Sequence, residues 1–109
     1  MRALLVSAIV FGTVACAPVE QAVDQTARQA AKGVVTETLA TRFPQVPKEL
    51  ITPFTDCIID NSNASEIRTY ARAAIVGVDD QTAATVRGVL ARPETVQCLG
   101  ASALQTRLS

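Results

Sequence analysis

The residues with the most specific chemistry in this sequence are its three cysteines, Cys16, Cys57 and Cys98. Cys16 ends an apolar N-terminal stretch, whereas Cys57 and Cys98 lie 41 positions apart in the rest of the chain. A pair of cysteines in an exported domain is typical of a disulfide. In the chain-entropy model, closing a loop of that length stabilises a fold by about 4 kcal/mol. We therefore predict a Cys57–Cys98 disulfide, provided that the chain enters an oxidising compartment; two buried free thiols are the alternative.

The first fifteen residues predict that export. Arg2 supplies one positive charge, the stretch from Ala3 to Ala15 is uncharged and strongly apolar, and it ends in small residues. This order is typical of a secretory signal peptide. A helix of that length spans only about 20 Å, whereas a bilayer core requires roughly 30 Å. We therefore predict a signal peptide at residues 1–15 rather than a transmembrane helix.

The end of this stretch, Thr13-Val14-Ala15-Cys16, resembles the lipobox of bacterial lipoproteins. The resemblance implies that the Cys16 thiol receives a diacylglyceryl group and that cleavage just before Cys16 makes it the N-terminal residue. Thr13 departs from the Leu that the family prefers. Ala17 after the cysteine resembles lipoproteins sent to the outer membrane, which would place the chain on its periplasmic face. Ordinary cleavage near Ala15 or Ala17, which would leave a soluble periplasmic or secreted protein, is the alternative.

The rest of the composition argues against several kinds of site. The chain contains no His and no Trp. This removes His-activated nucleophiles, imidazole metal ligands and the commonest general base near neutral pH. Ten basic residues balance ten acidic ones without a basic run, whereas nucleic-acid binding requires a concentrated positive patch. We therefore predict no catalytic residue, no cofactor, no metal site and no nucleic-acid partner.

Paired charges are the remaining candidates for chemistry. Paired carboxylates can perform acid–base work or bind a hard cation, but helix capping and solvent-facing positions explain them more simply. An enzyme would require a pocket lined by Arg68 and Arg72 or by Asp56 and Asp60. The pairs in question are Asp56 with Asp60, Asp79 with Asp80, and Arg68 with Arg72.

Residues 16–42 must position the anchor relative to the rest of the chain. Beyond Cys16, charged and polar residues recur at helical spacing, with Ala-rich positions between them, so the pattern predicts an amphipathic helix. This helix either packs on the domain behind it or forms a stalk. Residues 43–47 carry two prolines and predict a linker.

Residues 48–109 predict a compact domain of about four helices. Thr52-Pro53 is predicted to open the first, a capping box at residues 63–66 the second, Asp79 or Asp80 the third, and Pro93 the last; Gly77 is predicted to end the second. The predicted fold class is all-α, a small disulfide-stapled bundle preceded by an amphipathic helix. The expected inward residues are Ile51, Phe54, Cys57 and Ile58; Ile67, Tyr70, Ala71, Ala74 and Ile75; Ala83, Val86, Val89 and Leu90; and Val96, Cys98 or Leu99, Ala103, Leu104 and Leu108.

The latter half of the chain, from Asp56-Cys57-Ile58-Ile59-Asp60 through Arg92-Pro93-Glu94-Thr95-Val96-Gln97-Cys98, together with the signal, resembles small alphaproteobacterial envelope lipoproteins. The resemblance implies no known activity. Some such proteins carry a succinate dehydrogenase label, but the sequence lacks a flavin-binding turn, an iron–sulfur cysteine set and a haem-ligating His.

The hypothesis that follows is a lipid-anchored envelope protein with a structural or protein-interaction role. Its expected partners are the membrane surface, through lipidated Cys16, and another envelope protein. A soluble periplasmic or secreted binding module and an enzyme accessory subunit are the alternatives.

Overall fold

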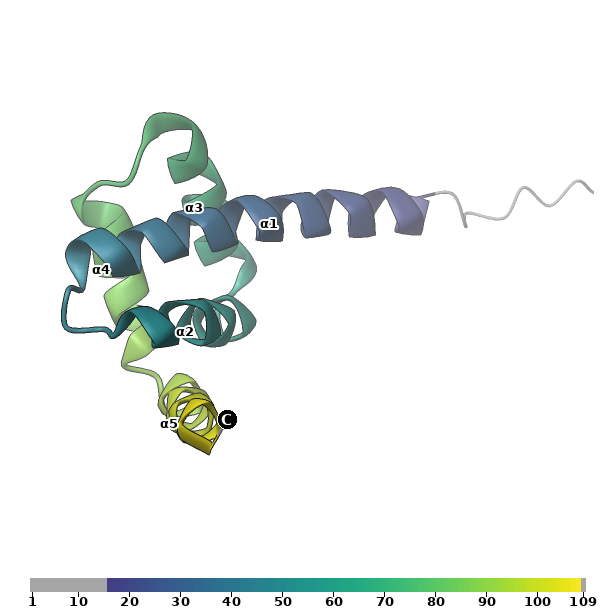
Figure 1. Cartoon of the computed structure of the whole chain (residues 1–109). Coiled ribbons are helices and arrows are strands. Elements are labelled where there is room, and N and C mark those ends of the chain that lie inside the picture. Colours follow the sequence, from purple (N-terminus) through teal and green to yellow (C-terminus); the bar gives the residue numbers. More distant parts are fainter. Residues whose placement is uncertain (1–15, 109) are drawn as a thin grey trace, which may run out of the picture.

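The computed structural model describes residues 16–108 and their side chains from residue 25 onward, so the predicted signal peptide at residues 1–15 and the side chain of Cys16 lie outside the described part. Within it the chain forms helices and no strand, and a disulfide joins Cys57 to Cys98. The predicted all-α, disulfide-containing fold is therefore confirmed. The helices, shown in Figure 1, are α1 (Cys16–Arg42), α2 (Lys48–Asp60), α3 (Ala64–Val76), α4 (Asp80–Leu90) and α5 (Pro93–Leu108).

The second half of α1 belongs to the core. Its buried residues recur every three or four positions, so they form one face of the helix; they are Ala31, Val34, Val35, Thr38 and Leu39. α2 and α3 pack on this part of α1. Figure 1 shows the N-terminal part of α1 extending beyond the other helices. Residues 16–42 therefore combine both arrangements that the sequence left open, a docked half and a projecting half.

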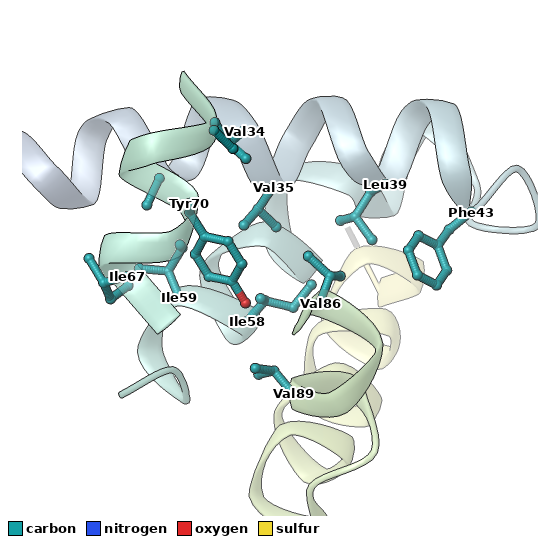
Figure 2. Packing of buried hydrophobic residues seen from close by; sticks show 12 residues of the cluster. Val34, Val35, Leu39, Phe43, Ile58, Ile59, Ile67, Tyr70, Val86 and Val89 are labelled. Atoms are coloured by element: carbon teal, nitrogen blue, oxygen red, sulfur yellow. The ribbon is translucent and has the colours of Figure 1, made fainter. Parts of the chain in front are cut away.

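Tyr70 of α3 lies at the centre of the hydrophobic core. Its side chain is fully buried, and Figure 2 shows the ring between Val35 of α1 and the pair Ile58 and Ile59 of α2. Val86 and Val89 of α4 close the cluster from another side. Burial raises the pKa of the Tyr70 hydroxyl, although a 3.5 Å contact with the Ser62 hydroxyl opposes that rise.

The loop between α1 and α2 contributes to the same core. Residues 43–47 form the predicted break between helices, and Phe43 at its start is buried. The Arg87 guanidinium of α4 lies 5.6 Å from the centre of the Phe43 ring, which is within cation–π range. The predicted linker thus also anchors α4 against the end of α1.

The prediction that Thr52-Pro53 opens α2 is wrong. The helix begins at Lys48, after an extended Pro47 (φ −61°, ψ 146°), and Pro53 lies inside it. Proline has no N–H, so α2 loses one bond in its second turn. The Leu50 N–H nevertheless donates to the Pro47 carbonyl at 2.9 Å, and the later turns bury Ile58 and Ile59. Packing of these turns outweighs the missing bond.

The predicted starts of α3, α4 and α5 and the predicted end of α3 are confirmed. Asn63 and Glu66 form a reciprocal capping box with both bonds at 2.9 Å, and Asp79 caps α4 by accepting from the Thr82 N–H at 2.9 Å. α3 ends at Gly77, whose φ of 99° favours glycine. Pro93 is the first residue of α5.

Several predicted inward positions are wrong, for reasons of helix geometry. In α3 the buried residues Ile67, Tyr70 and Ala73 recur every three positions, which turns the buried face away from Ala74 and leaves Ile75 87% exposed. In α5 the disulfide directs Cys98 toward α2. Val96 and Leu104, two positions before and six after Cys98, then lie on other sides of the helix. Both are exposed, as is Leu108. The predicted inward positions of α2 and α4 are buried or half-buried, and Cys98, Leu99 and Ala103 of α5 are half-buried.

Candidate functional site

The Cys57–Cys98 disulfide is the first feature that could carry chemistry. It joins α2 to α5, with 5.7 Å between the two Cα atoms. Cys57 is buried, whereas Cys98 is half-buried. The Ser102 hydroxyl of α5 lies 3.4 Å from the Cys57 sulfur. The disulfide predicted from the sequence is therefore present, and Cys98 is its more accessible cysteine.

An ion pair between Arg92 and Glu66 is the second feature, and it was not predicted from the sequence. The guanidinium donates to both carboxylate oxygens of Glu66, at 2.5 and 2.8 Å, and to the Asn61 carbonyl at 2.6 Å. Arg92 thus binds the end of α2 and the start of α3 at the point where α5 begins. Paired planar groups of this kind are among the stronger polar contacts.

The pKa values of this pair reflect the contact. Burial by itself would raise the pKa of Glu66, but the hydrogen bonds from Arg92 and from the Asn63 N–H outweigh it and hold that pKa below its usual range. The same hydrogen bond to Glu66 raises the pKa of Arg92. Both groups are therefore held in their charged forms.

The paired carboxylates do not form a common site. Asp56 pairs with Lys32 of α1 at 3.2 Å, and Asp80 pairs with Arg42 at 2.7 Å. Asp79 caps α4, and hydrogen bonds from the N–H and hydroxyl of Thr82 lower its pKa. These contacts tie α1 to α2 and to α4. Both ion pairs are largely exposed, so each contributes little to stability.

The remaining charged residues that an enzyme could use lie at two different hollows in the surface. A groove of about 720 Å³ lies where α1 leaves α2, and a hollow of about 200 Å³ lies between α3 and α4. Asp60 lines the first with Arg28 and Lys32, whereas Arg72 and Asp79 line the second. Arg68 lies on the exposed side of α3. The Asp56–Asp60 pair and the Arg68–Arg72 pair thus lie in different places, and the one carboxylate that shares a hollow with Arg72 is that of Asp79, which caps α4.

Comparisons with other proteins add no further candidate: no protein-family model, no curated protein and no solved structure matches the chain. Among the described residues there is no group of three side chains able to hold a metal ion. A search of the same residues finds no helix long and apolar enough to cross a membrane. What the protein does must therefore be inferred from the stapled helix, the projecting helix and the exposed surface.

Proposed function

We propose that this protein is a lipid-anchored component of the cell envelope whose folded part binds another envelope protein. The observation that carries the proposal is the continuity of α1. One helix leads from Cys16, the predicted lipid-bearing residue, to Ala31, the first buried residue of the described side chains. At about 1.5 Å per residue, these fifteen positions would hold the core roughly 22 Å from the attachment point. The helix is therefore suited to present a folded unit at a set distance from a bilayer.

Two further features support an envelope location. A diacylated Cys16 would carry two acyl chains, which give stable anchoring where a single chain gives only reversible binding. The disulfide is of the kind that persists in the oxidising compartments outside the cytoplasm. Together with Ala17 after the cysteine, these features favour the periplasmic face of an outer membrane.

Exposed apolar side chains support a protein-binding role. Ile75 and Val76 at the end of α3 are 87% and 68% exposed, and Leu104 and Leu108 of α5 are 60% and 80% exposed. Clusters of exposed large apolar residues are more typical of interaction sites than isolated ones. A partner that covers either helix end would remove this apolar surface from water.

The decisive experiment is an intact mass of the protein purified from its native host, measured before reduction and after reduction with alkylation. We expect the mass of residues 16–109 plus acyl groups, with two alkylatable thiols that appear only on reduction. A matched Cys16→Ser variant should lose the acyl mass and leave the membrane fraction. An unacylated mass beginning at or after residue 16 would instead favour the soluble binding module, and an uncleaved mass with three free thiols would refute export.

A further inference from the structure

The helix α5 is attached to the fold in a different way from the other four. The hydrophobic cluster at the centre of the molecule draws its residues from α1 to α4 and from the loops between them, and none of the described members comes from α5. Thr95 is the one residue of α5 that is buried, and its hydroxyl has no hydrogen-bond partner among the described residues. Hydrophobic packing therefore contributes little to holding α5 in place.

α5 packs mainly on α2, with a smaller contact to α4, and this packing adds no described residue to the hydrophobic cluster. From Cys98 onward α5 has four half-buried residues, Cys98, Leu99, Ser102 and Ala103; Cys98 is bonded to Cys57 of α2, and the Ser102 hydroxyl lies beside the Cys57 sulfur. Toward the far end of this contact an open gap of about 250 Å³ separates Leu50 in the first turn of α2 from Ala103 and Arg107 of α5. Since stabilisation scales with the apolar area removed from water, and α5 has no fully buried apolar side chain, its packing on α2 stabilises it less than the packing of the core stabilises α1 to α4.

Two fixed points supplement this packing. The first is the start of the helix, where Arg92 binds Glu66 and Asn61 and Thr95 is buried. The second is the disulfide, which ties Cys98 to a cysteine that is only 1% exposed. Beyond Cys98 the helix continues for ten residues to Leu108 without another buried side chain.

We propose that the Cys57–Cys98 bond is a redox-controlled clasp. Its reduction frees residues 96–108 from α2, while α1 to α4 and the start of α5 at Arg92 remain folded. Release uncovers Cys57 and widens the gap beside Leu50, so the face of α2 beneath α5 becomes accessible together with the apolar residues of the freed helix.

The reductant that fits is a dithiol. Its thiolate attacks the sulfur of half-buried Cys98, a mixed disulfide forms, and Cys57 leaves as a thiolate that takes up a proton. The second thiol of the reductant then attacks the mixed disulfide, and Cys98 leaves as a thiolate that is protonated in turn. Two electrons pass to the protein, which gains two thiols, and the reductant ends as a disulfide.

Hydrogen exchange read out by peptide mass spectrometry tests the proposal on the mature chain, oxidised and then reduced with dithiothreitol. We expect amides of residues 97–108 to exchange at least about tenfold faster after reduction, because a helix released from its neighbour opens locally. Amides in the second half of α1 and in α3 and α4 should remain the most protected after reduction, even where the loss of the closed loop speeds their exchange. Air oxidation should restore the slow exchange of α5.

A double Cys57→Ser, Cys98→Ser variant is the matched control, because dithiothreitol should leave its exchange pattern unchanged while α5 already exchanges fast. Unchanged exchange of residues 97–108 in reduced wild-type protein would overturn the proposal, since packing alone would then hold α5. Equally fast exchange throughout all helices would also overturn it, because the disulfide would then be a staple of the whole fold.

Discussion

The two terminal helices, α1 and α5, bind the rest of the molecule by opposite means. α1 places five buried side chains on one face at three- and four-residue spacing. α5 spreads its large apolar residues around its circumference, leaving Leu104 and Leu108 exposed, and is held by a disulfide and by the ion pair at its start. A helix with an apolar face docks by hydrophobic packing, whereas α5, which lacks such a face, is held at two points by the disulfide and the ion pair. The comparison shows that two similar helices in one small fold can have very different strengths of attachment.

The largest expected effect is that of a truncation in the docked half of α1. Leu39 is fully buried among α1 to α4. Leu39→Ala should lower the free energy of unfolding by about 2–5 kcal/mol, because it removes buried methyl groups and leaves a cavity. Urea unfolding followed by circular dichroism measures the loss.

The matched control for this substitution is Leu104→Ala in α5, which changes the same side chain at an exposed position. It should shift the free energy of unfolding by no more than about 0.5 kcal/mol. Equal losses from the two substitutions would show that the outer face of α5 is covered in solution and would remove the contrast between the helices.

A smaller effect is expected at the start of α5. Glu66→Gln keeps an oxygen that can accept from the Asn63 N–H but removes the negative charge opposite Arg92. The melting temperature should fall by a few degrees, less than for Leu39→Ala, because the pair is partly open to water. Differential scanning calorimetry measures the shift.

Asp80→Asn is the control for that variant, because the Arg42–Asp80 pair is exposed and lies away from α5. Its melting temperature should match that of the wild type. If the two variants melt alike, the charge pair between Arg92 and Glu66 does not secure the start of α5, which would then depend on the Arg92 bond to the Asn61 carbonyl and on the disulfide.

Local signals in the sequence predicted much of this arrangement. The Asn63–Glu66 capping box, the stop at Gly77 and the start at Pro93 each depend on residues within one turn, and all are present in the structure. The disulfide followed from the expectation of export, because paired cysteines have few alternatives if a chain enters an oxidising compartment. Features that depend on one or two neighbouring residues were therefore the accessible ones.

Features that depend on distant neighbours were not predictable. Arg92 and Glu66 are 26 positions apart, and nothing in either local sequence indicates that they meet. The outer positions of Ile75 and Leu104 follow from how α3 and α5 are rotated against α1 and α2, which their own spacing leaves open. The helix start predicted at Thr52-Pro53 was wrong because packing in the later turns of α2 outweighs the preference of proline for the first turn of a helix.

The smallest expected effect is an acid dependence that distinguishes the start of α5 from the core. The folded protein holds the pKa of Glu66 below its usual value of 4.5 and that of Asp79 below 3.8. A carboxylate whose pKa is lowered by folding stabilises the fold at any pH above its usual pKa. That stabilisation is lost as the pH falls from the usual pKa toward the pKa of the folded state. With no His in the chain, the melting temperature should change little between about pH 7 and 5 and fall below about pH 4.5.

Melting curves recorded between pH 7 and 3 for wild type and Glu66→Gln separate the contributions. The melting temperature of the variant should be lower at pH 7 and fall less on acidification, because it has no Glu66 carboxylate to protonate. Protonation of Asp79 contributes to the fall that the variant still shows. The two curves should therefore converge near the acid end, where protonated Glu66 is as neutral as glutamine. Parallel curves over the whole range would mean that the charge of Glu66 does not stabilise the fold, and Arg92 would then hold α5 through its bond to the Asn61 carbonyl alone.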